Sequence, residues 1–418
     1  MKPTSNPAPE FSPLFARRQP VFSRDAYRLM FFAGAVQLLA TLLFWSAELA
    51  GRLLAGWTPL HTVIPATWAH LFLMSYALFP FFIFGFLMTT LPRWLDGVAI
   101  PPHRHLTAFA LLAGGVVLFY AGLFFSKTVL TAGVTLLLAG WGAAIRALFI
   151  VYLGAKTADK HSAAIIQIAL AAGWVGLLCH LLWLLTGQID WLKVSMQMSV
   201  WLFLVPVLVA ISQRIVPRLS SRLLERDVAA ARNWLLPAVL GGGALHVVLA
   251  LAELPRWLFV ADLPLAAVAF YHALRWQIFS AFKLRSLAVL HIAWLWWGIA
   301  MLLFAVQSLT LLLVDQPILG AAPVHALGIG FATTLTLALA TRVTLRYAGG
   351  SRRLDSVAWA CFLGISVTAV LRIAAEIPLL AGHVGVSFNL LAALAWLVVL
   401  GAWVIKFAPH YFRQQAEA

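Results

Sequence analysis

The sequence contains few charged residues and no long polar segment. Asp, Glu, Lys and Arg make up 10% of its 418 residues, whereas soluble domains carry nearer a quarter. No polar stretch reaches about 50 residues, the smallest usual size of a separate soluble domain. Hydrophobic residues instead make up 63% of the chain. We therefore expect an integral membrane protein whose spanning segments pack against one another.

Cysteines and the motifs of soluble enzymes are also scarce. The two cysteines, Cys179 and Cys361, lie in apolar runs and form no CxxC pair, so they indicate neither a disulfide framework nor a redox compartment. The sequence has no HExxH, P-loop or G-x-S-x-G motif. Gly328 and Gly330 lie inside an apolar helix and do not follow a strand, which excludes a dinucleotide-binding fingerprint.

Twelve apolar runs are long enough to cross a bilayer, which takes about 20 residues each. They predict an all-α, polytopic membrane protein with a single twelve-helix transmembrane domain over residues 28–410. A cytoplasmic, proline-rich, disordered tail is expected at 1–27 and a cytoplasmic tail at 411–418. The first run is too long for a signal-peptide core, so we expect it to be retained. The runs are 28–50, 66–91, 106–126, 128–154, 162–187, 191–216, 233–252, 256–281, 286–313, 320–346, 355–380 and 384–408.

Basic residues are divided unevenly between the two sides of these runs. With the N-terminus inside, 24 of the 29 Lys and Arg fall on the inner side. The five on the outer side are Arg52, Lys127, Lys193, Arg256 and Arg372. This asymmetry follows the positive-inside rule and predicts an N-in, C-in topology. Because the basic residues lie in short loops, the net charge of +15 does not indicate a nucleic-acid partner.

Histidines are the polar residues in the runs that could carry chemistry. A polar side chain inside a bilayer is costly and usually faces the bundle interior. Neutral imidazole is a common ligand of metals and of haem iron, and helical bundles build such sites from facing helices. The predicted topology places four histidines in one outer layer and two deeper: His70, His180, His246 and His325, then His272 and His291.

The outer layer is thus a candidate haem or copper site. For each histidine alone, the alternative is a hydrogen-bonded or interfacial residue that binds no cofactor. Gly328 and other small residues on the face of His325 would admit either a flat macrocycle or a closely packed helix. Arg372 and Glu376 are spaced i, i+4, so we expect an ion pair. Arg372 is also a candidate to neutralise a haem propionate.

Four motifs resemble one known family. The first motif is similar to the family's histidine-led span ending in GFLLTAVPNW, and the last is similar to its HAL…G…T…L…MTR pattern. All four occur in the same order as in the family. On these residues, and over most of the runs, the chain resembles the NnrS family of bacterial membrane proteins. The motifs are Ala69-His70 with GFLMTTLPRW at 85–94, Arg214-Ile215-Val216-Pro217, Leu290-His291-Ile292-Ala293-Trp294, and His325-Ala326-Leu327 through Thr341-Arg342.

The resemblance implies haem and copper binding, a role in the nitric oxide response or in denitrification, and a multi-pass location in a bacterial inner (cytoplasmic) membrane. The positions that match the family's are His70, His291 and His325, which are therefore the implied metal ligands. Where we expect the family to have His-x-His-Glu, this sequence has Trp68-Ala69-His70-Leu71. That departure puts the second metal in doubt more than the haem.

The expected partners are the lipid bilayer and nitric oxide or a similar small ligand. The sequence indicates neither an electron donor nor a partner subunit, and it leaves open whether the protein is a haem-dependent oxidoreductase or only binds nitric oxide. Two other hypotheses stay open: a secondary transporter that uses its histidines, and a membrane sensor or scaffold without turnover. Against the transporter, we expect no broken-helix pairs and no Asp or Glu within the bilayer.

Overall fold

The computed structural model describes residues 21–347 and 353–413, with the side chains of 378–387 left aside. Within this described part every regular element is a helix, which confirms the all-α prediction. Segments η1, η2 and η4 are π-helical turns, and η3 and η5 are 3-10 turns. The elements in chain order are α2 (Val21–Arg24), α3 (Ala26–Leu53), α4 (Ala66–Phe72), η1 (Leu73–Leu78), α5 (Phe79–Trp94), α6 (Pro102–Phe125), α7 (Lys127–Leu153), α8 (His161–Thr186), α9 (Ile189–Gln197), η2 (Met198–Leu204), α10 (Val205–Leu224), α11 (Leu235–Leu251), η3 (Pro255–Trp257), α12 (Phe259–Arg275), α13 (Ile278–Ala281), α14 (Arg285–Val314), α15 (Ala322–His325), η4 (Ala326–Thr333), α16 (Thr334–Tyr347), α17 (Ser356–Ala374), α18 (Pro378–Phe407) and η5 (Ala408–Tyr411).

Eleven segments of the described residues are long and apolar enough to cross a membrane. Each corresponds to one of the predicted runs. The remaining run, 233–252, forms α11, which has 17 residues. At 1.5 Å per residue α11 reaches roughly 26 Å, less than a hydrocarbon core of about 30 Å. The chain is therefore a multi-pass membrane protein, while the count of twelve spans and the N-in, C-in topology stay predictions.

Several helix ends differ from the predicted limits, among them the end of α17 at Ala374, where 380 was predicted. Helix α10 continues through Pro217 to Leu224, past the predicted end at 216. The run predicted at 256–281 divides at Gln277, whose φ of 59° separates α12 from α13. Helix α18 begins at Pro378, before the predicted start at 384. Hydrophobicity marks only the part of a helix inside the bilayer, so it cannot show where a helix continues into water.

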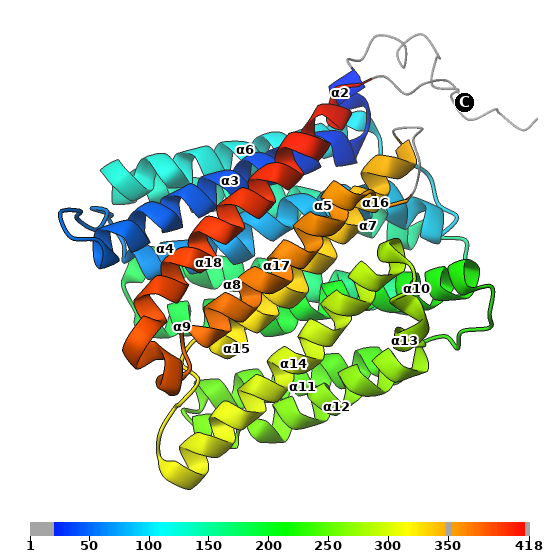
Figure 1. Cartoon of the computed structure of the whole chain (residues 1–418). Helices are drawn as coiled ribbons and strands as arrows, with labels where there is room; N and C mark the ends of the chain where they lie inside the picture. The colour runs from blue at the N-terminus through cyan, green and yellow to red at the C-terminus, as the bar shows by residue number, and fades with distance from the viewer. Residues whose placement is uncertain (1–20, 348–352, 414–418) are drawn as a thin grey trace, which may run out of the picture.

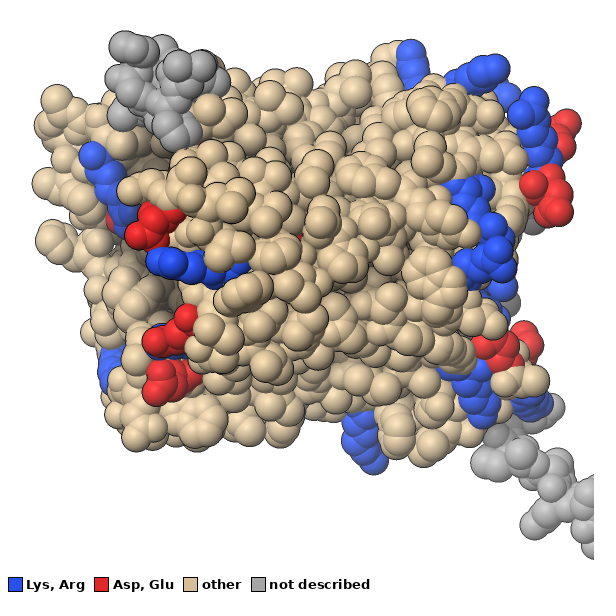
Figure 2. All heavy atoms as spheres, turned by 90° about the horizontal axis from the view of Figure 1, so that it is seen from below, with Lys and Arg blue, Asp and Glu red and all other residues tan. Residues whose placement is uncertain are grey.

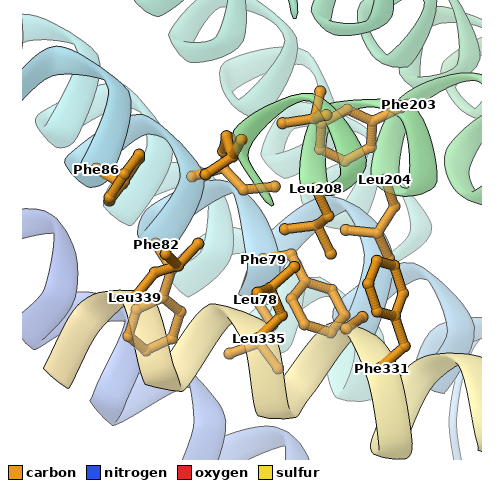
Figure 3. Close-up of a cluster of buried hydrophobic side chains, with 14 of the residues drawn as sticks. Leu78, Phe79, Phe82, Phe86, Phe203, Leu204, Leu208, Phe331, Leu335 and Leu339 are labelled. Atoms are coloured by element: carbon orange, nitrogen blue, oxygen red, sulfur yellow. The ribbon is translucent and has the colours of Figure 1, made fainter. Parts of the chain in front are cut away.

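Three spans form the centre of the bundle. The most buried spans of the described chain are residues 66–94, 189–224 and 322–347. In their most apolar stretches, 89%, 67% and 83% of the residues are buried. The same three spans contain the π-helical turns, which often occur at functional sites. Among the apolar side chains that gather where these spans meet are Phe79, Phe82, Phe203, Leu204, Phe331 and Leu335 (Figure 3).

Charged side chains gather at the two ends of the bundle, with an almost uncharged band between them (Figure 2). The cations predicted on the outer side are largely neutralised by acids. In the described residues, four of those five form ion pairs: Arg52 with Glu48, Lys193 with Asp190 and Glu253, Arg256 with Asp315, and Arg372 with Glu376. Asp and Glu contribute little to the positive-inside rule, so these pairs leave the predicted orientation untested.

The two described chain ends lie together at one end of the bundle (Figure 1). Arg28 on α3 donates hydrogen bonds to the carbonyl oxygens of Tyr411 and Arg413, at 3.1 and 2.8 Å. Residues 21–27, expected as the end of the first tail, form α2 and the start of α3. Residues 1–20 and 414–418 lie outside the described residues, so the predicted tails there stay predictions.

Candidate functional site

His325 is held in one orientation at the start of a central span. Its Nδ1 lies 2.7 Å from the carbonyl oxygen of Ala321. A carbonyl oxygen only accepts, so Nδ1 carries the hydrogen and a neutral ring has its lone pair on Nε2. The π-helical turn η4 begins at the next residue. A Cβ added to Gly328, one turn on, would meet no atom within 4 Å, so space lies beside this helix.

His70 lies in the corresponding position of another central span. Its ring stacks on the indole of Trp45 from α3, with centroids 4.2 Å apart and 15° between the planes. The Nδ1 atom of His70 is buried and has no hydrogen-bond partner. The π-helical turn η1 begins three residues later, at Leu73. Each of these two histidines thus precedes a widened turn of a buried helix.

The structure brings His70 and His325 together with Arg372. The two rings lie within range of electrostatic interaction with each other, and Arg372 on α17 lies within that range of both. Arg372 Nη1 and Glu376 Oε1 are 2.7 Å apart, which confirms the predicted ion pair. The Glu376 carboxylate in turn abuts Gly320, in the loop before α15. The result is a small polar site at the predicted outer end.

His180 lies at a similar depth but on the other side of α4. Its ring packs against Phe72 and Trp183, with centroids 4.4 and 5.0 Å apart. Side chains two positions apart on a helix point to nearly opposite sides, so Phe72 faces away from His70. His180 is therefore a buried residue of an aromatic cluster, and its Nε2 has no hydrogen-bond partner.

His246 forms a separate polar pair that the sequence interpretation missed. Its Nδ1 lies 2.7 Å from Oδ1 of Asp262, and its ring stacks on Trp201 of η2 at 3.6 Å. Asp262 lies inside the α12 span and is 0% exposed. The expectation that no acid lies within the bilayer is therefore wrong. The error arose because the apolar residues around Asp262 hid one carboxylate, whose partner lies on another helix.

His291 lies deeper than the His70 and His325 site. Gly330 on the His325 span abuts Trp296 of α14. Five residues separate each of these from its histidine, and the two helices run in opposite directions, so His291 and His325 lie roughly 15 Å apart along the helix axes. His291 Nε2 instead lies 3.2 Å from the hydroxyl of Ser220. One metal ion cannot bind both histidines at this separation.

A comparison with protein families matches the NnrS family model, described as NnrS protein, over residues 21–415. The match covers nearly the whole chain. The chain belongs to the NnrS family. No curated protein matched the sequence.

The motifs that carry the NnrS resemblance occupy the central spans and one neighbour. The segment 85–94 forms most of α5, and His325 through Arg342 runs along α15, η4 and α16. The segment 290–294 lies near the start of α14, and 214–217 lies in the middle of α10. These residues are far apart in the sequence, and two of the motifs lie on the spans that carry His70 and His325.

The residues at this site suit haem axial ligation better than a multi-ligand metal centre. In the described part of the chain, no three His, Cys, Asp or Glu side chains lie close enough to hold a metal ion. Haem needs fewer protein ligands, and His70 and His325 come from two helices. The unpartnered Nδ1 of His70, the fixed ring of His325 and the space beside Gly328 all fit such a group. The guanidinium of Arg372 would suit a propionate.

Two further residues help to build the site and gave little sequence signal. Trp45 orients His70, but it is one of 18 tryptophans, most of which would be expected at the membrane interfaces. Glu48, one turn on, is buried and accepts hydrogen bonds from Arg52 and from the backbone N–H of Leu60. Its spacing from Arg52 could have predicted the ion pair. Only the fold shows that this pair fixes the loop before α4.

Proposed function

We propose that this NnrS family member binds haem between α4 and α15 and acts in the nitric oxide response. His70 and His325 are the residues that would bind the haem iron, and Arg372 would pair with a propionate. The observation that carries the proposal is that two histidines from the two most buried spans lie within electrostatic range of each other and of one arginine. Each histidine has a ring nitrogen available.

The protein residues would determine where and how the group is held. The carbonyl of Ala321 fixes the ring of His325, which is the usual way in which a second residue orients a histidine ligand. Trp45 does the same for His70 through ring stacking. Bound haem would supply an iron centre for nitric oxide, which would have to displace one of the two histidines. Whether the protein reduces nitric oxide or only binds it depends on an electron source outside this chain.

Copper is the weaker part of the proposal. His291, the third implied metal ligand, lies with Ser220 and not with His70 and His325. In place of the expected His-x-His-Glu, Trp68 and Leu71 supply no ligand atoms. No three His, Cys, Asp or Glu side chains of the described residues lie close enough to hold a metal ion, so a copper site would need other ligands. We propose haem alone as the cofactor of the His70 and His325 site.

The absorption spectrum of detergent-purified protein tests this proposal. Protein expressed with ample haem supply should show a Soret band that shifts on reduction and again on addition of nitric oxide. His70→Ala or His325→Ala should remove or strongly shift the band. His180→Phe is the matched control, because His180 is a buried histidine at a similar depth that faces away from the site. A protein with no Soret band and no iron or copper by elemental analysis would rule the proposal out.

A second candidate function is proton-coupled transport, favoured by the Asp262 and His246 pair. Buried ionisable residues in membrane spans often lie on ion or proton pathways. This hypothesis predicts substrate-stimulated proton flux in proteoliposomes that contain metal-free protein, and it predicts loss of that flux in Asp262→Asn. Proton flux that persists in Asp262→Asn would show that the His246 and Asp262 pair is not needed for transport.

A further inference from the structure

A second candidate binding site lies at the opposite, predicted inner end of the bundle. A cavity of about 250 Å³ lies between the start of α8, the second half of α10 and the loop from α10 to α11. Polar and charged side chains on its walls include Ser162, Gln213, Arg214, Arg218, Arg232 and Asn233. The cavity is smaller than the roughly 300–1,000 Å³ of drug-sized ligand pockets. Its size suits a small polar group.

Hydrogen bonds between elements hold the walls of this cavity in place. Gln213 on α10 donates from Nε2 to the hydroxyl of Ser162 on α8, at 3.0 Å. Ser221 accepts from the backbone N–H of Val228 at 3.1 Å and lies 3.3 Å from its carbonyl oxygen. These bonds fix the loop from α10 to α11 against α10. The cavity is therefore built into the fold and does not depend on chance placement of surface side chains.

Arg214 supplies a positive charge and an unpaired donor. Its Nη2 donates to the carbonyl oxygen of Trp94 at 3.1 Å, and its guanidinium lies over the Trp94 ring at 5.1 Å. Its Nε is buried and has no hydrogen-bond partner. A buried donor without a partner is unfavourable. Arg214 therefore brings its charge to the cavity wall, while its Nε is not accessible to a ligand.

The lining carries an excess of positive charge. Arg214 and Arg218 are four residues apart on one face of α10 and interact electrostatically, and Arg232 adds a third guanidinium. The one carboxylate on the wall, Asp159, accepts a hydrogen bond from the backbone N–H of His161 at 3.1 Å. Ordinary positive-inside anchors extend into water separately, whereas these arginines converge on one cavity with amide and hydroxyl donors beside them.

We propose that this cavity binds a phosphate group, supplied either by the headgroup of an anionic phospholipid or by a free phosphate anion. Arginine binds phosphate oxygens through two parallel hydrogen bonds, and Asn233 and Ser162 add neutral donors. Basic pockets between helices on the cytoplasmic side of membrane proteins suit anionic lipid headgroups. The site is independent of the proposed haem site, because the two lie at opposite ends of the bundle.

Direct binding measurements distinguish the two sources of phosphate. Protein purified in phosphate-free buffer is titrated with inorganic phosphate by calorimetry. A second sample is offered short-chain phosphatidylglycerol, with phosphatidylcholine as the zwitterionic comparison, and retained lipid is counted by native mass spectrometry. Binding of phosphate alone identifies a soluble ligand, and preferential retention of phosphatidylglycerol identifies a lipid headgroup. Failure of both probes to bind overturns the proposal.

Matched variants place the binding in the cavity. Arg218→Gln should weaken binding about tenfold or more, since it removes a charged hydrogen-bond donor. Arg222→Gln makes the same change one turn further along α10, outside the cavity lining, and should change affinity less than about twofold by loss of long-range attraction. Asn233→Asp, at an exposed position, should abolish binding because its carboxylate repels the phosphate. This variant replaces Arg218→Gln in the test if Arg218→Gln misfolds. Equal weakening by Arg222→Gln would show diffuse attraction and no site.

Discussion

The imidazole of His70 lies almost flat on the indole of Trp45, with ring centroids 4.2 Å apart. Trp45 also contacts the guanidinium of Arg52, which lies over the indole 5.3 Å from its centroid. Arg52 in turn pairs with buried Glu48. A chain of contacts therefore runs from an ion pair on α3 to one face of the His70 ring. This arrangement covers one face of the ring and leaves its Nδ1 without a partner.

Trp45→Leu should weaken haem retention without removing a proposed ligand. Stacked aromatic pairs contribute about 0.5–1.5 kcal/mol, so loss of the stack should lower affinity roughly two- to tenfold. The haem-to-protein ratio of purified protein measures this effect. Trp45→Phe keeps an aromatic ring and should retain most of the haem. Equal ratios in wild type and Trp45→Leu would show that the stack does not position His70.

His246→Phe should destabilise the protein more than Asp262→Asn does. The phenylalanine leaves a buried carboxylate without a partner, which costs about 2 kcal/mol or more. Asparagine keeps an oxygen that can accept the hydrogen bond from Nδ1, so we expect a loss of about 1 kcal/mol. Unfolding of the purified protein by denaturant in mixed micelles measures both free energies of unfolding.

The double variant His246→Phe with Asp262→Leu serves as the control for that pair. It removes both polar groups, so it should be more stable than His246→Phe alone. With Asp262→Leu also measured alone, a double variant whose loss equals the sum of the losses of His246→Phe and Asp262→Leu would show that His246 and Asp262 do not interact. Such a result would also remove the observation that favours proton-coupled transport.

The fold class and the position of each histidine along its own span could be predicted from sequence, because both depend on hydrophobicity along one helix. The ion pair between Arg372 and Glu376 followed from spacing on one helix in the same way. Which side of a helix meets which neighbour could not be predicted, because that depends on the packing of all spans. His70 and His180 show the difference, since they share a depth yet lie on opposite sides of α4.

The predicted outer layer therefore divides into three places in the structure. His70 lies within electrostatic range of His325, His180 lies among aromatic rings, and His246 pairs with Asp262. Hydropathy averages over a window, so one carboxylate in an apolar helix leaves almost no trace. The π-helical turns after His70 and His325 were also invisible, because no local sequence rule separates them from ordinary helix.

Gly133→Ala should destabilise the hairpin of α6 and α7. An added Cβ at Gly133 would lie 2.6 Å from the backbone nitrogen of Phe119 and 2.9 Å from the carbonyl oxygen of Gly115. Backbone cannot move aside as a side chain can, so we expect a loss of about 1–3 kcal/mol in the free energy of unfolding. Thermal unfolding in detergent measures the change.

Gly241→Ala on α11 is the control for this substitution. A Cβ there meets no atom within 4 Å, and alanine favours the helix by about 0.5–1 kcal/mol. We expect Gly241→Ala to be neutral or stabilising. If both substitutions shift the unfolding temperature alike, close backbone contact is not what holds α6 against α7.

Asp355 should make a pH-dependent contribution to stability at the start of α17. Its carboxylate accepts from the backbone N–H of Ala358 at 2.9 Å and pairs with Lys406, and these contacts lower its pKa below the usual value. A lowered folded-state pKa stabilises the fold above the unfolded-state pKa of about 3.9, and this contribution disappears as the pH falls through the folded-state pKa. Asp355→Ala should therefore lose about 1 kcal/mol at pH 7, with the difference from wild type shrinking towards pH 3.

Asp355→Ser keeps an N-cap acceptor without the charge. Its stability at pH 7 should lie between that of wild type and that of Asp355→Ala, and it should depend less on pH than that of wild type. Thermal unfolding between pH 3 and 7 measures the difference, and a gap that stays constant or widens in acid would contradict the assignment.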